Sequence, residues 1–286
     1  MKNEPILQAA ENLPKSILLF VKILHHISPF LTLKLLILFL TKPIYFKTPD
    51  REKAFLSKSQ QSKLYIPSLK KSIQVYRLKS NGPKVLLVHG WSGRGSQLFN
   101  IAEQCYLEGY DVTTFDAPAH GKSGTRNTLL LEFVKCVQYL SKTIGPFNYA
   151  IGHSFGGISI LNAIRLNDSF DKVVVISMQE DIIESFRQFI KVFKLPQDYV
   201  ERINKFYYDK YKLSVTSFSP ISFVKDINIP ALIVHCEDDT DVPVSSAKIV
   251  HKLFKDSQLF LTKECGHRRI LRDEKTANEI VTFLKG

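Results

Sequence analysis

The chain has 286 residues, of which 44% are hydrophobic and 23% are charged. This composition excludes a disordered chain and a polytopic membrane protein, and the length suits one large α/β domain or two small ones. Lys and Arg outnumber Asp and Glu by 39 to 27, and the surplus is 11 within residues 1–84 but only 1 within residues 85–286. The basic first third is therefore the part to test for contact with nucleic acid or an anionic membrane.

The first third is predicted to contain two short helices, over residues 15–27 and 29–41. Ser28 followed by Pro29 is typical of a helix N-cap and first helical position. The second helix is apolar almost all round apart from Lys34 and its threonines, so it must be buried against protein or in lipid. We expect it to pack on the protein body, and peripheral membrane contact through residues 15–41 is the alternative.

Charged residues and a proline interrupt this apolar region, so no membrane-spanning segment is predicted. No small-residue cleavage site follows it, and we predict no secretory signal. The four cysteines form no C-x-x-C pair and do not lie at zinc-ligand spacing with histidine: Cys105, Cys136, Cys236 and Cys265. They are expected to be reduced thiols of a cytoplasmic protein.

Residues 1–71 are interpreted as a basic N-terminal helical extension and connector, without a recognisable nucleic-acid-binding module, so nucleic acid is not expected as a partner. Residues 72–286 alternate short apolar runs with helix-length segments, which predicts a mostly parallel sheet covered by helices on both faces. The expected strands are 73–78, 85–88, 112–115, 149–151, 173–177, 231–235 and 259–261. The expected helices are 96–108, 130–144, 156–167, 245–254 and 274–284.

One stretch, about residues 178–226, interrupts this alternation. It shows no strand pattern and holds ten aromatic residues. We expect a helical cap insertion over the carboxyl edge of the sheet, and ordinary helix packing is the alternative explanation of the aromatics.

The strongest chemical motif is Gly152-His153-Ser154-Phe155-Gly156, which follows a predicted strand and opens a predicted helix. This is G-x-S-x-G in a strand–turn–helix context, where the glycines relieve a sharp turn that exposes the serine hydroxyl. The N–H of Phe155, beside the helix N-terminus, is then available to an oxyanion.

A nucleophilic serine needs a base, and the base needs a carboxylate to orient it. Of the later histidines, His235 ends a strand before every plausible acid and His251 lies in a helical pattern. His267 follows Gly266 in a predicted loop between the last strand and the last helix, where a catalytic imidazole is expected. The loop after the 231–235 strand offers four candidate acids, which composition alone does not separate: Glu237, Asp238, Asp239 and Asp241.

A glycine-rich segment, residues 89–95 (HGWSGRG), follows the first predicted parallel strand. Its backbone, most simply the N–H of Trp91, can supply a second oxyanion donor. A nucleotide site is excluded because Leu98 stands at the third position of G-x-G-x-x-G and no Lys-Ser/Thr pair follows Gly95.

Together these residues resemble the α/β-hydrolase superfamily over residues 72–286. The matching motifs are His89-Gly90-Trp91, residues 116–123 (DAPAHGKS, with Ala119 where glycine is usual), residues 152–156, Asp239-x-x-Val242-Pro243 and Gly266-His267. Residues 89–97 and 266–273 (GHRRILRD) resemble one uncharacterised bacterial branch. The resemblance implies an eight-stranded, mostly parallel sheet, no metal or organic cofactor, and Asp239 as the preferred acid.

The sequence therefore predicts a serine hydrolase that cleaves a carboxylic ester or thioester through an acyl-enzyme, with Ser154, His267 and Asp239 as the triad. The aromatic cap suggests a small-molecule substrate with an apolar acyl group. Arg268 and Arg269 are candidates to hold a substrate carboxylate or phosphate, and a salt bridge that braces the loop is the simpler explanation. The alternatives are a membrane-surface lipid hydrolase and a non-catalytic binding protein on a hydrolase fold.

Overall fold

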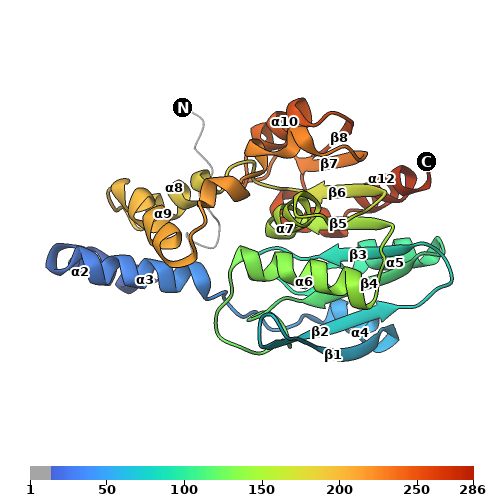
Figure 1. The fold of residues 1–286 in the computed structure, drawn as a ribbon, viewed down its shortest axis with the longest axis horizontal. Coiled ribbons are helices and arrows are strands. Elements are labelled where there is room, and N and C mark those ends of the chain that lie inside the picture. Colours follow the sequence, from blue (N-terminus) through green and yellow to red (C-terminus); the bar gives the residue numbers. More distant parts are fainter. Residues whose placement is uncertain (1–13) are drawn as a thin grey trace.

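Short runs of β-branched and aliphatic residues form the central strands of one sheet in the computed structural model, which describes residues 14–286 (Figure 1). Residues 1–13 of the predicted extension lie outside the described residues. The strand order is β1-β2-β4-β3-β5-β6-β7-β8, with β2 antiparallel to both of its neighbours and β3 to β8 parallel. The strands are β1 (Gln60–Ile66), β2 (Lys71–Leu78), β3 (Lys84–Val88), β4 (Asp111–Asp116), β5 (Tyr149–His153), β6 (Lys172–Ile176), β7 (Ala231–Cys236) and β8 (Ser257–Thr262). The predicted eight-stranded, mostly parallel sheet is confirmed.

Helices cover both faces of the sheet, as the alternation of strands and helices predicts. Buried side chains of α6, α7 and α10 form the core on one face, and those of α4, α5 and α12 form the core on the other. The bounds are α4 (Lys53–Lys58), α5 (Phe99–Leu107), α6 (Leu130–Thr143), α7 (Phe155–Arg165), α10 (Val244–Leu253) and α12 (Glu274–Lys285). Because β3 and β5 to β8 run parallel, the loops at their carboxyl ends meet along one edge.

The sheet begins earlier than the sequence indicates. Strand β1 lies within residues 1–71, which the sequence predicts to be a helical extension and connector. It pairs with β2 from Gln60 opposite Arg77 to Ile66 opposite Lys71. It is an edge strand whose side chains are mostly exposed, so it lacks the apolar run that marks the inner strands. The predicted boundary near residue 72 is therefore too late for the sheet.

The two predicted N-terminal helices are present as α2 (Lys15–Ile27) and α3 (Pro29–Thr41), with Ser28 accepting the N–H of Leu31 as an N-cap. They lie beside α8 (Ile182–Val192) and α9 (Asp198–Tyr211), the helices of the cap segment (Figure 1). Residues 178–226 contain these two helices and three short 3-10 turns but no strand.

A small separate core joins the N-terminal helices to the cap. Val21 and Leu36 are fully buried in it against Ile190 and Tyr199, and the rings of Phe39 and Phe193 stack with their centroids 5.7 Å apart. The helix pair thus packs on the protein body, as expected for an all-round apolar helix. Within the described chain, no helix has both the length and the apolarity that a membrane crossing requires.

Candidate active site

Ser154 stands at a sharp turn between β5 and α7. Its backbone has φ +51° and ψ −117°, a conformation that a non-glycine residue holds only when its surroundings enforce it. A Cβ on Gly152 would lie 2.5 Å from the Gly157 nitrogen, and one on Gly156 would overlap the Val88 carbonyl oxygen. The close approach of α7 to β5 and β3 therefore requires both glycines and presents the Ser154 side chain at the carboxyl edge of the sheet.

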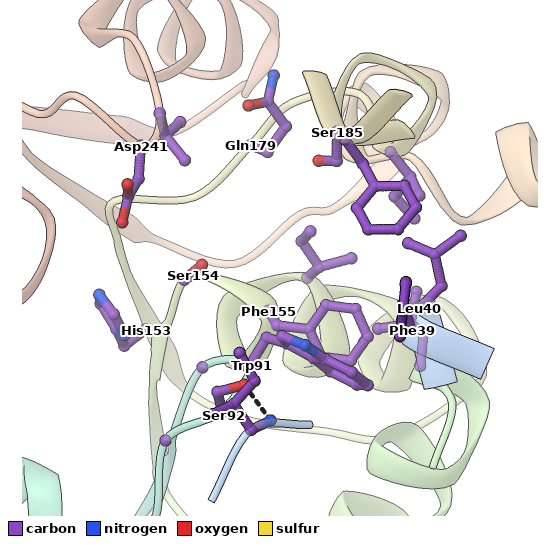
Figure 2. A pocket seen from close by; sticks show the side chains of 18 of the residues that line it. Phe39, Leu40, Trp91, Ser92, His153, Ser154, Phe155, Gln179, Ser185 and Asp241 are labelled. Atoms are coloured by element: carbon purple, nitrogen blue, oxygen red, sulfur yellow. Dashed lines mark hydrogen bonds between the residues drawn. The ribbon is translucent and has the colours of Figure 1, made fainter. Parts of the chain in front are cut away.

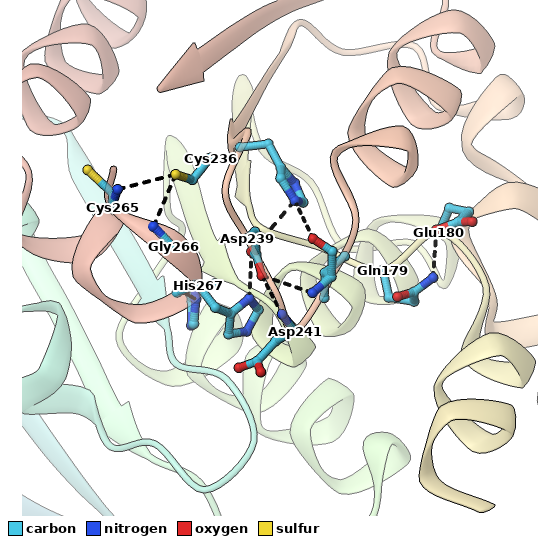
Figure 3. Close-up of polar contacts among 11 residues, drawn as sticks. Gln179, Glu180, Cys236, Asp239, Asp241, Cys265, Gly266 and His267 are labelled. Carbon is cyan, nitrogen blue, oxygen red and sulfur yellow. Dashed lines mark hydrogen bonds and ion pairs between the residues drawn. The ribbon is translucent and has the colours of Figure 1, made fainter. Parts of the chain in front are cut away.

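His267 and Asp239 are brought together from different loops (Figure 3). His267 Nδ1 lies 2.8 Å from Asp239 Oδ2, and the other carboxylate oxygen accepts the N–H groups of Asp241 and Val242 at 2.9 Å. Burial would raise the pKa of Asp239, but the hydrogen bond and charge of His267 outweigh it and hold that pKa below its usual value. The carboxylate is therefore ionised, rigid and positioned to orient one imidazole nitrogen.

The other candidate acids point to different partners. Glu237 forms a surface ion pair with Lys263 at 3.2 Å, and Asp238 accepts the N–H of Glu264 at 2.7 Å. Asp241 lines the large cavity described below. Among the four candidates, the structure thus places Asp239 against His267.

The loop that carries His267 is fastened to β7 and to the elbow. The sequence predicts a loop at this residue, whereas the structure places it in a one-turn helix, α11 (Gly266–Arg269). The N–H groups of Cys265 and Gly266 donate to Cys236 Sγ at 3.3 and 3.0 Å, and buried His153 contacts the His267 carbonyl oxygen through Nε2 at 2.9 Å. His153 was missed as a site residue because its only sequence signal is its place between Gly152 and Ser154.

The HGWSGRG loop lies directly on the elbow. A Cβ on Gly90 would be 3.1 Å from Ser154 Cβ, so the next residue, Trp91, starts beside the serine. The Trp91 and Phe155 rings meet edge to face at 5.4 Å (Figure 2). Phe155 is the first residue of α7, and its N–H therefore has no acceptor within the helix.

Asp116 holds this loop in place from the end of β4. Its carboxylate accepts the N–H groups of Gly95 and Lys122 at 2.7 Å and the Tyr76 hydroxyl at 2.8 Å. Ala119, at the position where the resembling motif has glycine, has φ +65°. The turn thus keeps its left-handed backbone even with alanine in it.

A cavity of about 830 Å³ opens over Ser154 (Figure 2). Its wall combines Ser154, Trp91, Phe155 and His267 with side chains of the cap and, unexpectedly, of the N-terminal extension. The cap contributes Phe186, Phe189, Phe193, Tyr207 and Tyr211, and the extension contributes Ile17, Phe39, Leu40, Ile44 and Phe46. The cavity is therefore mainly apolar and holds the proposed nucleophile and base in one wall.

The extension is tied to the site as well as packed beside it. The N–H of Ile44 donates to the Ser92 hydroxyl at 3.0 Å, and the carboxylate of Glu52 forms a buried, two-pronged ion pair with Arg94. Both partners belong to the HGWSGRG loop. The sequence does not predict these contacts, because they join segments that are 48 and 42 residues apart and share no pattern.

Arg268 and Arg269 follow His267 in α11 and are both exposed. Arg268 lines the large cavity, whereas Arg269 lines a neighbouring one and donates through Nε to the Cys265 carbonyl oxygen at 3.2 Å. Within the described residues, neither guanidinium lies within 4.0 Å of a carboxylate.

Comparison with known proteins finds similar sequences and similar structures. A family profile described as the alpha/beta hydrolase fold matches residues 83–203. Lysophosphatidylserine lipase ABHD12 from Danio rerio is 28% identical over 193 residues, covering 63% of this chain and 49% of that protein. Monoacylglycerol lipase ABHD6 from Mus musculus is 24% identical over 260 residues, covering 71% of this chain and 75% of that protein. The chain thus spans about half the length of the first relative.

The structure of mouse alpha/beta hydrolase domain-containing protein 10 superposes with a TM-score of 0.63 at 17% identity, covering 79% of this chain and 97% of that one. At that identity the superposition shows the fold alone. The profile match, the sheet order and the strand–turn–helix elbow agree with one another. This chain has the α/β-hydrolase fold, and its residues 83–203 are similar to the profile of that family.

Proposed function

We propose that this chain is a cytoplasmic serine hydrolase that cleaves a carboxylic ester or thioester with an apolar acyl group. The observation that carries the proposal is that Ser154, on its strained elbow, shares one apolar cavity with His267, whose Nδ1 contacts buried Asp239 at 2.8 Å. Nucleophile, oriented base and acyl-binding space are the parts that acyl transfer requires. Both curated relatives are lipases by name, which supports an ester substrate.

In this mechanism the Ser154 hydroxyl attacks the acyl carbon while His267 Nε2 takes its proton. The carboxylate of Asp239 accepts the Nδ1–H and stabilises the imidazolium that forms. The N–H groups of Phe155 and Trp91 bind the oxyanion. His267 then returns the proton to the leaving oxygen or sulfur, and water, activated by the same ring, hydrolyses the acyl-enzyme.

The cavity predicts a preference for long acyl chains. Each methylene that leaves water contributes about 0.8 kcal/mol, so kcat/KM should rise on the order of 100-fold from a butanoyl to an octanoyl ester. The measurement is a series of acyl p-nitrophenyl esters and acyl-CoA thioesters of increasing length. A maximum at the acetyl ester would contradict the assignment of the cavity to the acyl group.

A second candidate, hydrolysis at a membrane surface, is favoured by the outer face of the α2–α3 helix pair. That face exposes large apolar side chains: Leu19, Phe20, Ile23, Ile27, Phe30, Leu31 and Leu38. Residues 14–49 contain five lysines, all exposed, and no Asp or Glu. Apolar side chains flanked by lysines fit the interface of an anionic bilayer.

We expect co-sedimentation with vesicles that contain phosphatidylserine and much weaker co-sedimentation with phosphatidylcholine vesicles. The double substitution Leu19→Glu with Phe30→Glu should lower the vesicle-bound fraction about tenfold or more, because two buried apolar contacts become charges. Leu107→Glu is the matched control, since Leu107 is 75% exposed on α5 of the body. Equal losses in both variants would contradict a specific docking face.

A further inference from the structure

A second, polar cavity of about 620 Å³ adjoins the apolar one. His267 and Arg268 line both cavities, as do Arg51 and Gln97, so the two spaces meet at the proposed catalytic base. The elements that enclose the second cavity come from distant parts of the chain. They are the 3-10 turn Asp50–Glu52, the loop after β7, and α11 with the turn that follows it.

Four arginines converge on this second cavity: Arg51, Arg268, Arg269 and Arg272. Within residues 14–286, none of the four has a carboxylate inside 4.0 Å. The lining carboxylates are otherwise engaged, because buried Glu52 pairs with Arg94 and Ser96 and Asp238 accepts the Glu264 N–H.

The guanidinium groups also act on one another. Burial and the neighbouring charges of Arg51 and Arg269 lower the pKa of Arg272. Like charges held this close repel each other unless an anion lies between them. A simple loop-bracing salt bridge, the other explanation of Arg268 and Arg269, would place a carboxylate beside them.

His267 lies between the arginine-lined cavity and the proposed reaction, because it lines both cavities. In the proposed function His267 returns a proton to the departing oxygen or sulfur, so the leaving group must pass beside its ring. The apolar cavity, which His267 lines, suits the acyl chain. The arginine-lined cavity, which His267 lines as well, is then the space into which the leaving group extends.

We propose that the second cavity binds a phosphate carried by the leaving group, so that the substrate is an apolar acyl ester or thioester of a phosphate-bearing alcohol or thiol. This inference rests on the proposed function for the direction of the leaving group. Guanidinium forks match phosphate oxygens in charge and geometry. The overall reaction adds water across the acyl bond and releases a fatty acid and the phosphate-bearing alcohol or thiol.

The kinetic test compares 1-decanoylglycerol 3-phosphate with 1-decanoylglycerol, and decanoyl-CoA with p-nitrophenyl decanoate. We expect kcat/KM to favour the phosphate-bearing member of at least one pair by about tenfold or more, chiefly through KM. The pair with the larger ratio identifies the source of the phosphate. The double variant Arg269→Gln with Arg272→Gln should lower that ratio about tenfold, because both side chains line only the second cavity.

Arg202→Gln is the matched control, because Arg202 is an exposed arginine on α9 that pairs with Asp198 at 2.8 Å and does not line either cavity. The kcat/KM ratio of the Arg202→Gln variant should equal that of the unmodified protein. Ratios near one for both substrate pairs, or a double variant that keeps the full ratio, would overturn the inference.

A binding measurement separates failure of this inference from failure of the proposed function. Trp91 is the chain's only tryptophan and lines the apolar cavity, so its fluorescence reports occupancy without turnover. The ether analogue 1-decylglycerol 3-phosphate should bind about tenfold more tightly than 1-decylglycerol, and the double variant should lose this difference. If no ester is hydrolysed but the difference is present, the phosphate site stands and the hydrolase assignment fails; equal binding overturns the site.

Discussion

Replacing Ser154 with alanine is expected to lower kcat for ester hydrolysis by about 10⁴-fold or more, because the attacking oxygen is removed while the fold is kept. Covalent labelling by a fluorophosphonate probe should disappear in the same variant. The measurements are turnover of a p-nitrophenyl ester and the mass of the labelled protein, with the label located on Ser154. The alanine Cβ occupies the place of the serine Cβ, so thermal unfolding should change little.

Ser185→Ala is the matched control. Ser185 lines the same cavity from α8, away from the elbow (Figure 2), and its loss should leave labelling complete. Full labelling of the Ser154→Ala variant would contradict the assignment of Ser154 as the nucleophile. An unmodified protein that shows no acylation burst with activated esters would instead favour the non-catalytic binding protein.

A second large effect is expected on stability below about pH 6.5, and it originates in histidines buried in the neutral form. His89 and His120 each accept a backbone N–H at Nε2, from Ala117 and Ser92 respectively, at 3.0 Å. Their Nδ1 atoms donate to carbonyl oxygens. A proton added at Nε2 would break an existing bond and leave two donors facing each other.

His153 is also buried in a site that disfavours a second ring proton. Its Nε2 donates to the His267 carbonyl oxygen, and its Nδ1 is buried without a hydrogen-bond partner in the described structure. Burial lowers the pKa of His89 to about 4 and those of His120 and His153 to about 3. The folded protein therefore keeps all three rings neutral at pH values where the unfolded chain protonates them.

The direction of this pH effect follows from the number of protons that the folded and unfolded states bind. Below about pH 6.5 the unfolded state binds more protons, so the free energy of unfolding falls as pH falls and is fully regained above that value. Each ring contributes about 1.4 kcal/mol per pH unit, which gives a loss of about 6 kcal/mol for the three at about pH 5. That is comparable with the whole stability of an ordinary domain.

Urea unfolding between about pH 7.5 and pH 5 measures this slope. Burial lowers the pKa of His235 as well, so His153→Gln removes one of four such rings and should reduce the slope by about a quarter. The exposed His26 provides the control His26→Gln, which should leave the slope unchanged. A free energy of unfolding that stays flat over this range would contradict the neutral burial of these rings, and histidine Cε1–H shifts would show which ring titrates.

The parts of the fold that local chemistry determines could be predicted from the sequence. The break between α2 and α3 follows from Ser28 and Pro29, and the inner strands follow from short apolar runs between turn residues. Strand β1 was not predicted, because an exposed edge strand such as residues 60–66 needs only its neighbour's backbone and carries no apolar run.

The elbow serine was predictable because its motif is contiguous, whereas its partners depend on long-range contacts. The loop that holds Asp239 contains three other carboxylates of the same local character, and their separation depends on where His267 arrives. The extension's part in the cavity wall was not predictable for the same reason. An all-round apolar helix shows that α3 must be covered but does not show by which element.

The α2–α3 pair presents two different surfaces, one to the cavity and one to solvent. Its inner side chains, including Phe39 and Leu40, close the cavity, and its outer side chains are exposed and flanked by lysines. A lipid surface could bind the outer face more tightly in one position of the two helices than in another. Because the same helices line the cavity, such binding would change the affinity of the cavity for its substrate. By thermodynamic reciprocity, substrate changes the affinity for that surface by the same factor. Deleting the helix pair would alter both the lipid affinity and the substrate affinity at once. Only substitutions on the outer face can therefore measure the coupling between these two affinities.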